Sequence, residues 1–96
     1  MSRDEILRLL SHHRGDIERF GVKSLALFGS SARGEAGERS DVDLLVEFAE
    51  PVGLFKFLDL KEYLENLLRC EVDLATPDAL KRQLRATILA EAVHAF

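Results

Sequence analysis

The 96-residue chain is 47% hydrophobic, carries a formal net charge of −4 and holds a single cysteine. These values predict one folded domain over residues 1–96, and they exclude general disorder and an internal disulfide. The net negative charge argues against direct nucleic-acid binding. No apolar run approaches the ~20 residues of a membrane span. With a single cysteine, the chain fits a reducing compartment, so we expect a cytoplasmic protein.

The first half of the chain predicts a helix, a strand and a second, short helix. Ser2 followed by Glu5 is a capping-box pattern that predicts the start of a helix. Gly21 is a natural stop for this helix. The segment "KSLALF", residues 23–28, is short and apolar, as in a buried strand. Residues 30–34 predict the short helix, and the turn-rich "GEAGERS" follows. The apolar stripe of the first helix consists of Ile6, Leu9, Leu10, His13, Ile17 and Phe20.

The second half predicts strand, helix, strand and helix. "DVDLLVEF", residues 41–48, alternates, so Val42, Leu44, Val46 and Phe48 share one face, and Asp41, Asp43, Leu45 and Glu47 share the other. "LFKFLDLKEYLENLLR" is an amphipathic helix, and "CEVDLA" is a third strand. Thr76-Pro77 suits the start of a last helix whose apolar stripe is Leu80, Leu84, Ile88 and Ala92. The order predicts an α/β fold, with helices covering a small sheet.

Gly29 and Ser30 lie where the first strand gives way to the short helix. A glycine at this point lets another group approach the backbone, and free N–H groups with a serine hydroxyl suit a phosphate. By itself the pair is more typical of a plain turn than of a phosphate site.

Three aspartates form the second candidate feature. Asp41 and Asp43 lie two residues apart on one strand face, roughly 7 Å along the chain. Asp73 lies in the next strand, and pairing the two strands in register would set it beside them. Such a cluster is stable only if cations offset its charge, which indicates Mg²⁺, and Asp73 could also accept a proton from an acceptor hydroxyl. The alternative is that Asp41 is a turn residue and Asp43 a solvated acid.

Gly29-Ser30, ten further residues and then Asp41-Val42-Asp43 resemble the G-S-x10-D-x-D signature of the nucleotidyltransferase superfamily related to DNA polymerase β. The longer string "GSSARGEAGERSDVDLLVEF" resembles the minimal nucleotidyltransferases, and the likeness extends through "EVDLATPDALK" to "ILAEAVHAF". The resemblance implies a polymerase β-like fold in which helices pack on a small mixed sheet.

The same resemblance implies roles for individual residues. Gly29 and Ser30 would hold the triphosphate of ATP, and the catalytic acids Asp41, Asp43 and Asp73 would bind two Mg²⁺ ions. Arg33 would contact phosphate, or else pair with Glu35 or Glu38 in the loop. Arg39 is a further phosphate candidate.

Minimal nucleotidyltransferases typically pair with a helical HEPN-domain protein as a toxin–antitoxin system. The implied reaction is transfer of AMP from ATP to a tyrosine hydroxyl of this RNase toxin, with release of pyrophosphate. In so small a chain we expect the acceptor to supply most of its own recognition, which favours a protein partner in a hetero-oligomer. The alternative is that a second copy of this chain, in a homodimer, supplies the missing side of the acceptor site. Two alternatives stay open: an antitoxin that neutralises its partner by binding alone, and a transferase acting on a small molecule or an RNA end.

Overall fold

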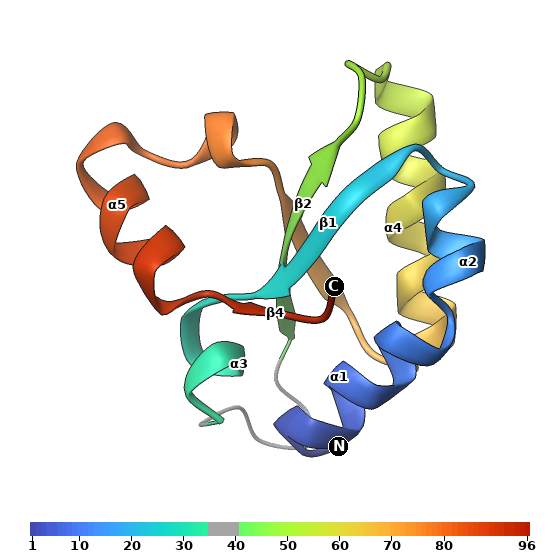
Figure 1. Cartoon of the computed structure of the whole chain (residues 1–96), viewed down its shortest axis with the longest axis horizontal. Helices are drawn as coiled ribbons and strands as arrows, with labels where there is room; N and C mark the ends of the chain where they lie inside the picture. Colours follow the sequence, from blue (N-terminus) through green and yellow to red (C-terminus); the bar gives the residue numbers. More distant parts are fainter. Residues whose placement is uncertain (35–40) are drawn as a thin grey trace.

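A four-stranded mixed sheet forms the centre of the molecule (Figure 1). The computed structural model describes residues 1–34 and 41–96. The strands are β1 (Val22–Leu27), β2 (Val42–Phe48), β3 (Val72–Ala75) and β4 (Val93–His94), in the order β3-β2-β1-β4. Strand β2 runs antiparallel to β1 and parallel to β3, and β4 runs antiparallel to β1. The predicted α/β class with a small mixed sheet is confirmed.

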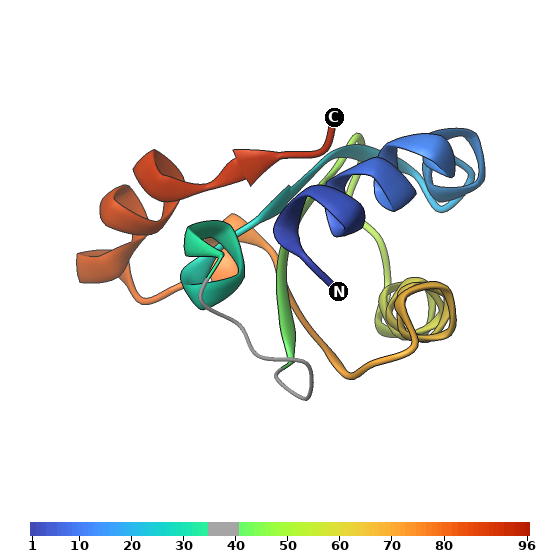
Figure 2. The same cartoon turned by 90° about the horizontal axis from the view of Figure 1, so that it is seen from below.

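The helices divide into two groups around this sheet (Figure 1, Figure 2). Helices α1 (Arg3–His12), α2 (Arg14–Glu18) and α4 (Leu54–Leu68) lie to one side of it. The short α3 (Gly29–Arg33) and α5 (Arg82–Glu91) lie to the other. None of the helices in the described parts of the chain combines the length and apolarity that a membrane crossing requires.

The alternation of β2 decides which of its residues enter the core. Val42, Leu44 and Val46 are buried, as the pattern predicts, and they pack in one cluster with side chains of α1, α2 and α4. Those helical side chains are Ile6, Leu10, Ile17, Leu60, Leu64 and Leu68. The opposite face of β2 therefore points away from the core helices and carries Asp43, and Asp41 directly precedes the strand.

The first predicted helix is two helices. Ser2 caps α1 as expected, since its Oγ accepts the Glu5 N–H at 3.2 Å. At His13 the backbone leaves the helical region (φ −99°, ψ 18°), and α2 begins at Arg14. The apolar stripe survives the break because Ile6, Leu10 and Ile17 are all buried.

The prediction for the last helix is wrong at its start, and the apolar stripe of that helix is not buried. Thr76 makes no side-chain cap, and Pro77–Ala79 form only a single 3₁₀ turn, η1. Leu80 is extended (ψ 144°), so α5 begins at Arg82 and buries none of its residues. An amphipathic pattern indicates a helix but does not say whether the rest of the fold covers its apolar face.

Strand β4 is not predicted from the sequence, in which Val93 and His94 directly follow Ala92 of the apolar stripe. Val93 and His94 instead pair with Leu27 and Ala26 at the edge of the sheet. Two residues give no readable period, so only pairing with β1 makes this segment a strand.

Candidate active site

The turn between β1 and α3 is shaped around a carboxylate. Gly29 has φ +60°, a left-handed conformation that side chains rarely adopt. A Cβ atom at this position would lie 2.8 Å from Oδ2 of Asp43. The sequence predicts a close approach to the Gly29 backbone, and in the protein alone the approaching group is the Asp43 carboxylate.

The sheet register brings two of the three predicted acids together. Asp43 on β2 is the register partner of Asp73 on the parallel strand β3. Asp41 lies one residue before the start of β2. Asp43 is half-buried, whereas Asp41 and Asp73 are exposed, so the group is open on its outer side.

The carboxylates repel one another in the protein without ligands. Burial, above all, and then the negative charges of Asp73 and Asp41 raise the pKa of Asp43 above its ordinary value. The Arg33 guanidinium partly offsets this effect. A net negative charge therefore collects where β2 and β3 run side by side.

The chemistry of this donor set suits a hard divalent cation. Carboxylate oxygens are the protein ligands that Mg²⁺ takes, together with substrate phosphates and water. In the described parts of the chain, no three His, Cys, Asp or Glu side chains are arranged as a group that could hold a metal ion. The pairing of β2 with β3 thus brings the carboxylates of Asp43 and Asp73 onto neighbouring strands, but in the described residues the side chains do not form a closed set of metal ligands.

Ser30 and Arg33 both lie on α3. Ser30, beside Gly29 at the start of the helix, is half-buried. Arg33 near its end forms an ion pair with Glu91 of α5, with Nη1 and Oε2 3.6 Å apart. The partners expected for Arg33, Glu35 and Glu38, and the candidate Arg39 lie outside the described residues.

Ser31 is a residue of the site that the sequence does not single out. It is only 2% exposed, and its Oγ accepts the backbone N–H of Asp43 at 3.0 Å. The sequence carries no mark that separates it from its neighbour Ser30, because its partner is a backbone group on β2, which is distant in sequence.

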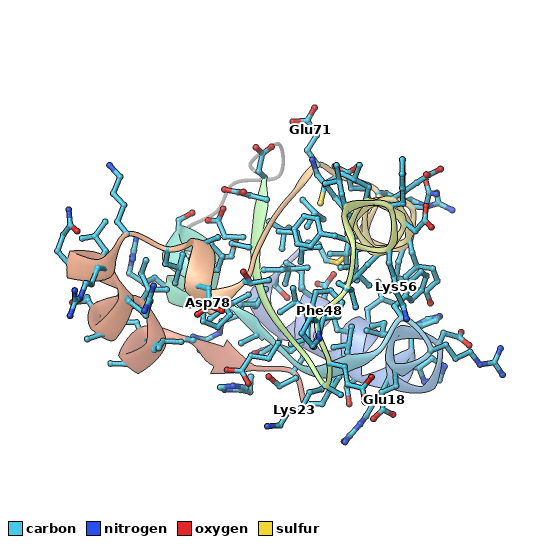
Figure 3. The ribbon with its side chains drawn as sticks, turned by 90° about the horizontal axis from the view of Figure 1, so that it is seen from above. Glu18, Lys23, Phe48, Lys56, Glu71 and Asp78 are labelled. Carbon is cyan, nitrogen blue, oxygen red and sulfur yellow. The ribbon has the colours of Figure 1, made fainter. Side chains whose placement is uncertain are left out.

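A cavity of about 730 Å³ lies at the C-terminal end of β2, opposite to the end that carries Asp43. At this end β2 and β3 finish and α4 begins. Lys23, Phe48 and Asp78, from β1, β2 and η1, are among its lining residues (Figure 3). Neither the three acids nor Gly29 and Ser30 line it. The cavity is therefore separate from the candidate site.

Comparison with known proteins agrees with this geometry. Residues 10–94 match the nucleotidyltransferase domain family. The protein adenylyltransferase MntA of Thermococcus cleftensis is 48% identical over 92 residues, which cover 95% of this chain and 93% of that protein. A solved structure described as a minimal nucleotidyltransferase is 41% identical with a TM-score of 0.75, covering 91% of this chain and 93% of its own.

A more distant structure shows the same fold. It is the MNT antitoxin complex with the tri-AMPylated HEPN toxin of Shewanella oneidensis, which matches with a TM-score of 0.65 and 18% identity over 94% of this chain and 71% of that one. The resemblance seen in the G-S-x10-D-x-D motif is confirmed by the family match and by the close relative. The chain belongs to the nucleotidyltransferase domain family, as a homologue of the protein adenylyltransferase MntA.

Proposed function

We propose that this chain, acting as one nucleotidyltransferase domain over residues 1–96, is the antitoxin of a toxin–antitoxin pair. It transfers AMP from ATP to a tyrosine hydroxyl of a HEPN-domain RNase toxin and releases pyrophosphate. The observation that carries the proposal is the pairing of Asp43 with Asp73 beside the Gly29 turn. The name of the MntA relative and the AMPylated toxin of the S. oneidensis complex support the choice of reaction and acceptor.

Each site residue then has a task. The Gly29–Ser30 turn and the Ser30 hydroxyl donate hydrogen bonds to triphosphate oxygens. Asp41, Asp43 and Asp73 hold Mg²⁺, with two ions expected for three carboxylates and a triphosphate. Bound Mg²⁺ supplies charge neutralisation of the triphosphate and lowers the pKa of the attacking oxygen.

In this proposal Asp73, whose side chain is exposed, receives the proton of the acceptor hydroxyl. As the tyrosine Oη loses its proton, it forms a bond to the α-phosphorus of ATP. The bond between the α-phosphorus and the oxygen that bridges to the β-phosphate breaks, and its electron pair leaves with pyrophosphate. The product is a phosphodiester between tyrosine and AMP.

A protein acceptor is compatible with a group of acids that is open on its outer side. Asp41 and Asp73 are exposed, so a tyrosine on the surface of another chain can reach them without entering a closed pocket. We infer a hetero-oligomer with the toxin, whose surface completes the site around the acceptor tyrosine.

Labelled ATP tests this function directly. The purified chain is incubated with Mg²⁺, its HEPN toxin and ATP labelled at either the α- or the γ-phosphate. We expect covalent label on the toxin from α-labelled ATP alone, because the AMP moiety is transferred and the β- and γ-phosphates leave. Replacement of the acceptor tyrosine of the toxin by Phe should remove the label.

Other outcomes assign the chain differently. Toxin that is silenced but carries no label from any nucleoside triphosphate would identify an antitoxin that acts by binding alone. Label that appears on a small molecule or on an RNA end, without the toxin, would show that the acceptor is not a protein.

Arg33→Ala tests the proposed phosphate contact of this residue. A hydrogen bond from a charged donor is worth ~1.5 to 3 kcal/mol, so the KM for ATP should rise about 10-fold or more. The free energy of unfolding should change by less than ~1 kcal/mol, because the side chains of Arg33 and Glu91 are 48% and 51% exposed.

Glu91→Gln is the matched control, since it breaks the same ion pair but leaves the guanidinium in place. The KM for ATP should stay at the wild-type value in this variant. Equal increases in the two variants would assign the effect to the contact between α3 and α5 and remove Arg33 from the phosphate site.

A further inference from the structure

The ladder of hydrogen bonds between β1 and β2 ends in an incomplete pair. The N–H of Phe28 donates to the C=O of Asp43 at 3.0 Å. In a regular antiparallel pair of this kind the two residues exchange both bonds, so the Asp43 N–H would donate to the Phe28 C=O. Here the Phe28 C=O accepts the Ala32 N–H at 3.3 Å instead, as the first helical bond of α3.

The hydroxyl of Ser31 replaces the missing acceptor. Its Oγ lies 3.0 Å from the Asp43 nitrogen, and the residue is 2% exposed. A buried N–H without an acceptor is costly, so the strand could not otherwise keep this amide while the chain turns away into α3. Ser31 lets the backbone leave the sheet at Phe28 without loosening Asp43.

Asp43 is consequently held by three parts of one turn. Phe28 binds its C=O, Ser31 binds its N–H, and the backbone of Gly29 lies against its carboxylate. The same turn carries Ser30. The distance between the proposed triphosphate turn and the half-buried acid is thus set by hydrogen bonds rather than by side-chain packing alone.

We propose that Ser31 is a positioning residue, whose hydroxyl fixes the backbone of Asp43 against the Gly29–Ser30 turn so that the carboxylate meets the metal–triphosphate group in one geometry. The inference rests on the proposed function. Ser31 is not a catalytic residue, because its oxygen is occupied by a backbone amide and faces the protein interior.

The hydrogen bond itself is tested by amide exchange in the metal-free chain. In Ser31→Ala the Asp43 amide should exchange about 10-fold faster than in the wild type, because it loses its acceptor. Ser31→Thr keeps the oxygen and should retain slow exchange. Ser11→Ala removes the hydroxyl of an exposed serine on α1, away from this turn, so it should leave the Asp43 amide protected.

The positioning role is tested by metal binding and by kinetics. Outer residues that orient a metal ligand typically contribute 10- to 100-fold in affinity or activity. We therefore expect Ser31→Ala to weaken Mn²⁺ binding, measured by electron paramagnetic resonance, by about 10-fold and to lower kcat by a similar factor. The KM for ATP should stay within about twofold, because Ser30 and the turn remain. The control Ser11→Ala should match the wild type in Mn²⁺ affinity, kcat and KM.

Three results would overturn the inference. The first is an Asp43 amide that stays protected in Ser31→Ala, and the second is faster exchange with unchanged Mn²⁺ affinity and kcat. The third is a wild-type chain that binds no Mn²⁺. Amide exchange and Mn²⁺ binding need no toxin, so a failure to label the toxin would count against the proposed function and leave the test of Ser31 intact.

Discussion

Asp43→Asn is expected to abolish AMP transfer while leaving the metal-free protein at least as stable as the wild type. Loss of a carboxylate that holds the metal removes several kcal/mol of transition-state stabilisation, which corresponds to a fall in kcat of about 1,000-fold. Transfer of α-label to the toxin gives the activity, and denaturant unfolding in a chelator gives the free energy of unfolding.

The stability result follows from the electrostatics of the site. Burial and the charges of Asp73 and Asp41 raise the pKa of Asp43 in the folded protein. A raised pKa means that folding favours the protonated form, so ionised Asp43 opposes folding at neutral pH. The stabilising contribution of its proton is fully present below the unfolded pKa and is lost as the pH rises through the folded pKa. In Asp43→Asn the free energy of unfolding should not show this decrease as the pH rises from the unfolded pKa of Asp43 through its folded pKa.

Asp59→Asn is the matched control, because Asp59 is an exposed acid on α4 and lies outside the site. It should keep wild-type transfer. An Asp43→Asn protein that still labels the toxin at the wild-type rate would remove Asp43 from the metal site. A large loss of stability in the metal-free variant would contradict the repulsion assigned to the three acids.

Gly29→Ala should lower kcat much more strongly than it lowers the free energy of unfolding. A non-glycine residue in the left-handed region loses ~1 to 2 kcal/mol. At this position the added Cβ would also lie 2.8 Å from Oδ2 of Asp43, so the carboxylate must shift. We expect kcat to fall about 100-fold, because a displacement of about 1 Å in a catalytic group has effects of this size.

Gly34→Ala separates the effect of left-handed backbone strain from the effect of the contact with Asp43. Gly34 ends the same helix with φ +72°, but among the described residues no heavy atom beyond its chain neighbours lies within 4 Å of the position that an added Cβ would take. It should show the same backbone strain in unfolding experiments and near-normal kcat. Equal losses of kcat in the two variants would assign the Gly29 effect to strain in α3 and not to the Asp43 contact.

Much of the site was predictable because strand geometry is local. A strand period of two predicts that Asp41 and Asp43 share one face, and apolar alternation identifies that face as the one away from the core. In the structure Asp43 lies on this face of β2, and Asp41 directly precedes the strand. Asp73 could be placed beside them on the assumption that two short apolar strands pair in register, and the sheet confirms the Asp43–Asp73 pairing.

Other features depend on partners that are distant in sequence, and local patterns carry no information about these. The last helix shows an amphipathic stripe, yet the fold buries none of it, and the two residues of β4 become a strand only by pairing with β1. The ion pair of Arg33 with Glu91 likewise joins two helices from different parts of the chain.

By itself the sequence determined the class of the fold, which follows from the order of its helices and strands, and also the face that carries the acids and the family motif, which follow from spacing along one segment. Only the tertiary structure decided how Asp43 is held: Gly29 makes room for its carboxylate and Ser31 binds its amide. Those contacts arise where two strands and a helix meet. A hydrogen bond between a helix side chain and the backbone of a strand leaves no period in the sequence.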